Sequence, residues 1–334
     1  MPNASTDNPR HLDPTIQMRV AQAYANGEGT HRELAERFNL RNAAAANHAC
    51  YYGRVLLGLP HPVRRRNGRT EVATATGWMV VSSRKWGVEV EVSGLSVSGS
   101  AAALRRVGVD VEERHGWTQH GAARGHDRPT VKVEPDGTCG VSAEAVLPPV
   151  AGDEGLALLK TVMAGLKAGG ARISNACGMH VHVDANDLTA EQMVALVDQW
   201  VTIQSAVYRL VPAGRRRSQW CPPLSGWDVR NLRERLTDGS LRPGGRTGVD
   251  RYRGLNLDAY RAYGTVEFRI HGGSLNATKA KHWVALVVGI VEAAKTGVTL
   301  DGTTTETLVR SMADAGLLPA TSAEWLTNRA AALA

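Results

Sequence analysis

Residues 177–184 read Cys-Gly-Met-His-Val-His-Val-Asp, and this stretch restricts the fold more than any other part of the 334-residue chain. Its apolar and polar residues alternate as in a β-strand, where side chains two positions apart share a face. His180 and His182 therefore point in the same direction. Two imidazoles on one face fit a metal site, but they also fit a pair of hydrogen-bonded histidines inside a sheet. The other polar segments of the chain are needed to distinguish these two interpretations.

Three strand-like segments of the chain carry polar residues at positions i and i+2. The pairs are Glu89/Glu91, His180/His182 and Glu267/Arg269, the last followed by His271 on the same expected face. A buried carboxylate is costly unless it is paired or bound to a cation, so three such faces favour a shared site. We expect the three strands to point these side chains into one cavity, together with Glu144 from the apolar segment 141–150.

The chemistry of these side chains favours one class of metal. Sites rich in oxygen with few nitrogen ligands suit Mg²⁺ or Mn²⁺ better than zinc. Such ions commonly hold nucleotide phosphates, and an arginine nearby can stabilise a phosphoryl group in transfer. No GxxxxGK[ST] motif occurs, which excludes a P-loop enzyme. Neither Cys139 nor Cys177 has an activating partner placed by a motif, so we interpret both as inert thiols.

Charge and hydropathy limit the possible partners. The formal net charge is +7, carried mostly by arginine, which favours polyanions such as nucleotide phosphates or nucleic acid. No apolar run approaches the roughly 18 residues of a membrane span, and the first 14 residues are polar. We therefore expect a cytoplasmic protein without a membrane partner; the sequence leaves its oligomeric state open.

The N-terminal segment has a helical pattern. We predict helices over 14–25, 31–38 and about 42–57, with Thr30 and Glu33 forming a capping box before the second. The arrangement resembles a helix-turn-helix, and residues 1–70 contain ten arginines against five acids, which fits contacts to DNA phosphates. Because the third helix is mostly alanine, a plain helical packing unit is an equally open interpretation.

The remaining chain mixes strands and helices. We expect strands near 130–134 and 141–150, helices over 153–168, 189–210 and 279–294, and a flexible loop near a ligand over 212–248. We therefore predict that the chain divides into four segments: a helical unit over 1–58, a basic linker over 59–82, a catalytic domain over 83–300 and a helical tail over 301–334.

Four short motifs occur in a fixed order: WGVEVEV, then a DG turn with VSAEAVLPP, then CGMHVHVD, then LNL before GTVEFRIHGG. This succession resembles the amidoligase family of carboxylate-amine ligases, which is similar to glutamine synthetase and glutamate-cysteine ligase. The resemblance covers roughly residues 84–295. It implies an α+β fold with a curved antiparallel sheet of glutamine-synthetase-like type, flanked by helices and holding ATP and divalent ions.

The resemblance also implies roles for individual residues. Glu89, His180 and Glu267 would ligate the metal that bridges the ATP phosphates, and Glu91 and Glu144 would hold a second metal near the acyl phosphate. Arg269 would neutralise the transferred phosphoryl group, His182 would contact phosphate or support a ligand, and Asp136 lies in the turn next to the site. Asn256 and either Arg251 or Arg253 would lie in the substrate or nucleotide pocket. Glu91, Glu267 and Arg269 would carry the catalysis.

The implied reaction joins a carboxylate to an amine or ammonia at the expense of ATP, through an acyl phosphate. Two alternatives stay open from the sequence. One is a DNA-binding regulator whose ligase-like domain senses a ligand, and the other is a metal-dependent hydrolase that uses the same carboxylates and histidines without ATP.

Overall fold

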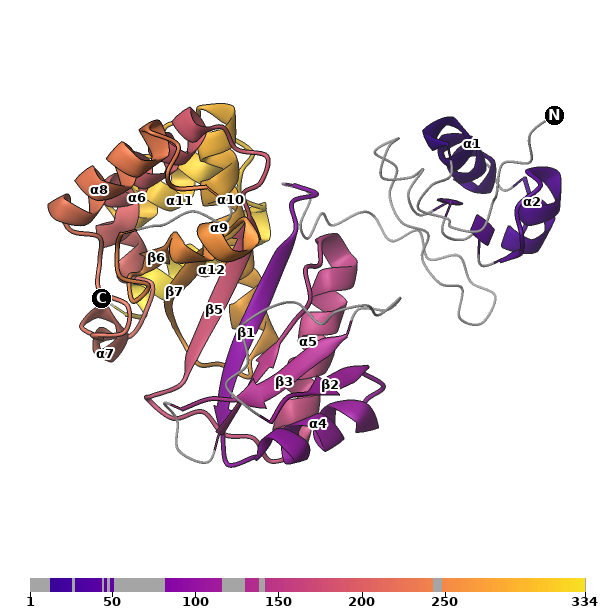
Figure 1. The fold of residues 1–334 in the computed structure, drawn as a ribbon, viewed down its shortest axis with the longest axis horizontal. Coiled ribbons are helices and arrows are strands. Elements are labelled where there is room, and N and C mark those ends of the chain that lie inside the picture. The colour runs from indigo at the N-terminus through magenta and orange to yellow at the C-terminus, as the bar shows by residue number, and fades with distance from the viewer. Residues whose placement is uncertain are drawn as a thin grey trace. The chain divides into compact units, whose positions relative to one another are not determined.

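The computed structural model describes residues 13–25, 28–43, 45–46, 49–50, 82–115, 130–137, 142–242 and 248–333. The chain divides into two compact units, Met1–Thr76 and Gly77–Ala334, each of which is considered by itself (Figure 1). None of the helices in the described part of the chain is long and apolar enough to cross a bilayer.

The first unit contains α1 (Pro14–Ala25) and α2 (His31–Arg37). The capping box is confirmed: Thr30 Oγ1 accepts from the Glu33 amide, and Glu33 Oε2 accepts from the Thr30 amide at 2.6 Å. Val20 and Ala21 of α1 form a small core with the helical residues Ala49 and Cys50. Most of the helix predicted over 42–57, and nearly all of the basic linker predicted over 59–82, lie outside the described residues.

The second unit is built on one seven-stranded sheet with the order β2-β3-β4-β1-β5-β7-β6. The strands are β1 (Trp86–Ser93), β2 (Val111–Glu113), β3 (Val131–Pro135), β4 (Ser142–Val146), β5 (Gly178–Asp184), β6 (Leu255–Asn256) and β7 (Thr265–Gly272). The α+β class is confirmed. The sheet is mostly antiparallel, as expected: β2 pairs with β3 in parallel at one edge, and every other pair is antiparallel.

Helices flank this sheet (Figure 1). They are α4 (Val97–Arg106), α5 (Gly152–Ala168), α6 (Ala190–Tyr208), α7 (Ala213–Arg216), α8 (Gly226–Thr237), α9 (Asp258–Tyr263), α10 (Ala277–Thr296), α11 (Thr305–Asp314) and α12 (Ala320–Ala331). The last two, which make up the C-terminal tail, contact α10 and belong to the same compact unit as the sheet.

One face of the sheet forms the main hydrophobic core. Val88, Val90 and Val92 of β1 alternate with the polar residues of that strand and are fully buried. They join one apolar cluster with residues from α4, α5, α6 and α10, and Trp200 of α6 packs edge-on against Phe268 of β7 with ring centroids 5.4 Å apart. Each such side chain contributes about 1.5–3 kcal/mol through burial. The alternation leaves the polar residues of the same strands on the opposite face.

The segment predicted as one flexible loop over 212–248 contains two helices, α7 and α8, so the prediction is wrong for these residues. Ser225 caps α8 through a capping box with Asp228, and Val229, Leu232 and Leu236 bury one face of the helix against α6. The capping residue and the i, i+3/i+4 apolar spacing were present in the sequence. Pro, Gly and Arg on either side obscured them.

A buried histidine between α10 and α12 predicts a pH-dependent stability. The His282 ring stacks on Trp325 with centroids 4.9 Å apart, and its Nδ1 lies 2.9 Å from Ser322 Oγ. Burial, together with the charge of Lys281, lowers the pKa of His282 to about 4. Since the unfolded chain has the ordinary value of about 6.5, the unfolded state binds more protons between those two values. Stability is therefore full above about pH 6.5 and falls as the pH drops toward 4.

The variant His282→Gln should flatten this dependence. Urea unfolding at pH 7 and pH 4.5 should differ less in the variant than in the wild type, by on the order of 1–3 kcal/mol. Burial also lowers the pKa of His271 to about 4, so part of the slope stays in the variant. An unchanged pH dependence would show that His282 is not buried in its neutral form.

Candidate active site

The polar face of the sheet collects side chains from six neighbouring strands. Register brings Glu89 opposite His180, and His182 lies opposite Glu267, which in turn pairs with Asn256. In the next cross-strand row, Glu91, Glu144 and Glu134 lie side by side on β1, β4 and β3. The three polar pairs Glu89/Glu91, His180/His182 and Glu267/Arg269 share this face, as expected. Of these residues, Glu89 and His182 line the cavity described below.

Glu89 lies at the centre of the group. Its Oε2 is 3.1 Å from His180 Nδ1, and its Oε1 is 3.1 Å from His182 Nε2. The other nitrogen of His182 is 3.0 Å from Thr265 Oγ1, which fixes the ring. His180 Nε2 also approaches Glu91 Oε1 to 3.5 Å. One carboxylate therefore joins both imidazoles.

Glu267 completes the group from β7. Its Oε1 is 3.5 Å from His180 Nδ1 and 3.9 Å from His182 Nε2, and the same oxygen pairs with Arg269 Nη1. Asn256 Nδ2 donates to Glu267 Oε2 at 2.6 Å. The guanidinium of Arg269 also lies over the ring of Tyr252, 5.7 Å from its centroid. Asn256 therefore orients Glu267, and Arg269 is held between a carboxylate and an aromatic face.

Electrostatics divide the carboxylates into two kinds. Burial works to raise the pKa of Glu89, but the charges and hydrogen bonds of His182 and His180 outweigh it and hold the pKa well below its ordinary value. For Glu144, burial raises the pKa, and the neighbouring carboxylates of Glu89, Glu91 and Glu134 raise it further, to well above the ordinary value. The part of the site around Glu144 therefore has more carboxylates than cationic groups to neutralise them.

The residues can hold divalent cations. Two groups offer ligand atoms that all lie within 4.8 Å of one another: Glu89, His182 and Glu267, and Glu89, Glu144 and His180. Carboxylate oxygens with one imidazole each suit Mg²⁺ or Mn²⁺, and a cation would relieve the repulsion that raises the pKa of Glu144. The grouping differs from the assignment that the resemblance implied: His182 stands beside Glu89 and Glu267, and Glu144 beside His180.

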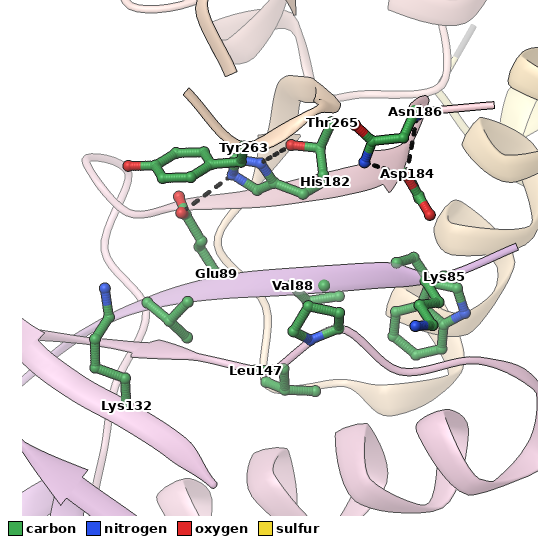
Figure 2. Close-up of a pocket in the computed structure, with 14 residues that line it drawn as sticks. Lys85, Val88, Glu89, Lys132, Leu147, His182, Asp184, Asn186, Tyr263 and Thr265 are labelled. Atoms are coloured by element: carbon green, nitrogen blue, oxygen red, sulfur yellow. Dashed lines mark hydrogen bonds and ion pairs between the residues drawn. The ribbon is translucent and has the colours of Figure 1, made fainter. Parts of the chain in front are cut away.

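A cavity of about 380 Å³ adjoins this cluster. Glu89 and His182 line one end, and Figure 2 shows Glu89 extending from β1 toward His182, with Tyr263 beside them. Val146, Leu147 and Pro149 supply apolar lining, while Lys132, Asp184 and Asn186 are among its polar lining residues. The volume is within the range of small-molecule sites.

Two residues that we expected at the site, Arg253 and His271, lie outside the cluster around Glu89. Arg253 Nε pairs at 3.0 Å with the fully buried Asp228 of α8. Arg251, like Arg269, lies over the ring of Tyr252. His271 does not continue the Glu267/Arg269 face, so that expectation is wrong. The pairs Val181–Phe268 and Met179–His271 are two residues apart on β5 but three residues apart on β7, so β7 has a bulge there. Beyond the bulge, the His271 ring packs against Trp283 of α10.

Sequence reasoning missed polar residues of β3. Lys132 and Glu134 lie on the site face, with Lys132 Nζ 2.8 Å from Glu134 Oε1, and both are buried. Their i, i+2 spacing is the same signal that singled out the other strands. Tyr263 and Thr265 were also missed, because a tyrosine at a helix end and a threonine at a strand start carry no pattern of their own.

Gly178 predicts a steric test of the site. A Cβ at this position would lie 2.6 Å from His180 Nε2 and 3.3 Å from Glu91 Oε2. Gly178→Ala should therefore displace the imidazole and weaken Mn²⁺ binding by about 10- to 100-fold, the range found when a ligand loses its support. Calorimetric titration with Mn²⁺ measures this. Gly214→Ala, where a Cβ meets nothing within 4 Å, is the matched control. Equal Mn²⁺ affinities for the two variants would contradict this view of His180.

Comparison with known proteins supplies the family. The family model described as "Putative amidoligase enzyme" matches residues 82–291, more than half of the chain and all seven strands. No curated protein matches. Among solved structures, the chain is similar to a bifunctional glutathione synthetase from Pasteurella multocida, with 12% sequence identity and a TM-score of 0.39. That alignment covers 79% of this chain and 49% of the other, so this chain spans about half the length of that protein. On the family match, the chain belongs to the amidoligase family.

Proposed function

We propose that the protein is an ATP-dependent carboxylate-amine ligase that forms an amide bond through an acyl phosphate. The observation that carries the proposal is the cluster around Glu89, in which one carboxylate contacts both imidazoles and lies beside the Glu267–Arg269 pair. All of these residues fall inside the segment that matches the amidoligase family.

Divalent ions would be held by the two ligand groups that share Glu89. Glu267 and His182 would complete one site, and Glu144 and His180 the other, with Glu91 next to His180. Bound Mg²⁺ or Mn²⁺ would neutralise the phosphate oxygens of ATP. Without such charge, the triphosphate would meet a face rich in carboxylates.

The cavity beside the cluster would hold the nucleotide. Its apolar wall of Val146, Leu147 and Pro149 would contact the nucleoside, and its end at Glu89 and His182 opens toward the ligand groups. Arg269 lies further along β7, beyond Glu267, and the structure gives it no role in lining the cavity. We therefore place the carboxylate substrate on the side of the Glu89 cluster where Arg269 lies, opposite the nucleotide cavity. The phosphoryl group would then pass over the cluster from ATP to the substrate.

The reaction balances without a further reactant. A carboxylate oxygen of the substrate attacks the γ-phosphorus of ATP, and the bond from that phosphorus to ADP breaks. The amine nitrogen then attacks the acyl carbon, the bond to phosphate breaks, and the nitrogen releases a proton. Arg269 would stabilise the charge on the transferred phosphoryl group, and the cluster would hold the reactants in line.

The test is release of ADP by the 334-residue chain. With Mg²⁺ present, ADP release should depend on a carboxylate and an amine supplied together, and mass spectrometry should find their amide. Panels of amino acids and short peptides, each with ammonia or an amine, cover the substrate classes. Turnover of a substrate without ATP would instead identify a metal-dependent hydrolase and contradict the proposal.

A further inference from the structure

A buried lysine faces the cavity from β3. Lys132 pairs in register with Val146 of β4, which pairs in turn with Glu89 of β1, so the three residues form one cross-strand row on the polar face. The side chain of Lys132 is only 3% exposed and lines the cavity. Figure 2 shows its ammonium group and the Glu89 carboxylate on the same side of the sheet.

Lys132 retains donors for a ligand. Among the described residues its ionic partner is Glu134, whose Oε1 is 2.8 Å from Lys132 Nζ. An ammonium group has three protons to donate, and an ion pair with one carboxylate oxygen leaves protons for other acceptors. Burying an ammonium is costly unless hydrogen bonds satisfy it, so the remaining protons favour an anionic ligand in the adjoining cavity.

The position of Lys132 identifies the part of the ligand that it would meet. Lys132 and Lys85 are the lysines that line the cavity, and Lys85 is exposed. Glu89 and His182, which border the ligand groups for the divalent ions, line the same cavity as Lys132. A nucleotide whose phosphates reach those groups would carry negative charge past Lys132.

We infer that Lys132 binds a phosphate oxygen of the nucleotide, and that Glu134 holds its ammonium group in place for this contact. The inference rests on the proposed function, since it takes the cavity ligand to be ATP. It assigns a recognition role to a residue of β3, a strand that supplies no member of the two groups of metal ligands. The competing interpretation is that Lys132 only neutralises Glu134.

The first experiment compares Lys132→Met with the wild type by titrating ATP, ADP, AMP and adenosine in the presence of Mg²⁺. A hydrogen bond to a charged group predicts that Lys132→Met binds ATP about 10- to 100-fold more weakly. Adenosine affinity should stay within about threefold, because adenosine has no phosphate. Lys167→Met, which removes an exposed lysine from α5, controls for the change in net charge. Unchanged ATP affinity in Lys132→Met would overturn the inference, as would a larger loss in Lys85→Met.

A second variant separates binding from charge neutralisation. The double variant Lys132→Met/Glu134→Gln removes the buried pair together and avoids leaving Glu134 uncompensated, which protects the fold if Lys132→Met alone is unstable. If Lys132 contacts phosphate, the double variant should bind ATP as weakly as Lys132→Met. Recovery of wild-type ATP affinity in the double variant would overturn the inference, because Lys132 would then serve only Glu134.

Tripolyphosphate distinguishes this inference from the proposed function. If the wild type binds tripolyphosphate with Mg²⁺ in a Lys132-dependent way but does not bind ATP, the proposed function fails and the anion contact stands. If the wild type binds ATP and Lys132→Met binds it equally well, the inference fails and the function stands. Binding of neither compound to the wild type would refute both.

Discussion

Replacing Glu89 by glutamine should reduce ADP release by on the order of 10²- to 10³-fold, the range for losing one preorganised polar group that stabilises a transition state. Glu89 belongs to both candidate groups of metal ligands and contacts both imidazoles, so a neutral amide weakens every part of the cluster. The measurement is ADP release together with Mn²⁺ binding, and both should fall.

The control for Glu89→Gln is Glu154→Gln, which removes a carboxylate from the exposed first turn of α5. Its ADP release should equal that of the wild type. The melting temperature of Glu89→Gln should fall below that of the wild type, because His182 and His180 hold the pKa of Glu89 well below its ordinary value and the ionised carboxylate therefore stabilises the fold. Circular dichroism at the assay temperature establishes that the variant is still folded. Wild-type activity in Glu89→Gln would exclude Glu89 as a ligand.

Replacing Arg269 by lysine should have the second large effect, a loss in kcat of about 10³-fold, as found for arginines that stabilise a phosphoryl group in transfer. The planar guanidinium pairs with Glu267 and stacks over Tyr252, and a lysine cannot reproduce both contacts. Within the part of the chain that the structure describes, Arg269 Nε is buried without a hydrogen-bond partner, so it has a donor to offer a substrate.

The kinetic signature decides the role of Arg269. A group that acts on the transition state predicts that kcat falls while the ATP dissociation constant changes by less than about fivefold. If Arg269→Lys weakens ATP binding and leaves kcat intact, Arg269 holds the bound nucleotide and does not stabilise the transfer.

The strands that carry the site follow from local patterns in the sequence. Alternation with period two marks β1, β5 and β7, and it gives the face on which Glu89, His180 and Glu267 lie. Because one face of each strand had to be buried, the polar residues of all three strands had to share the other. The capping boxes of α2 and α6 were equally local signals.

Cross-strand neighbours do not follow from local patterns. The grouping of His182 with Glu267, and of Glu144 with His180, depends on strand order and register, which distant segments set together. The bulge in β7 removes His271 from the site and leaves no mark in the alternating sequence. Lys132 had the right spacing, but its meaning depends on a cavity that residues from five strands and α9 enclose.

The measurement that tests the central claim most directly is equilibrium binding of ATP to the 334-residue chain with and without divalent ions. The account predicts that ATP binds in the presence of Mg²⁺ or Mn²⁺, that EDTA abolishes the binding, and that Glu89→Gln weakens it strongly while Glu154→Gln does not. ATP affinity that is the same with EDTA and in Glu89→Gln, or no ATP binding under any of these conditions, would contradict it.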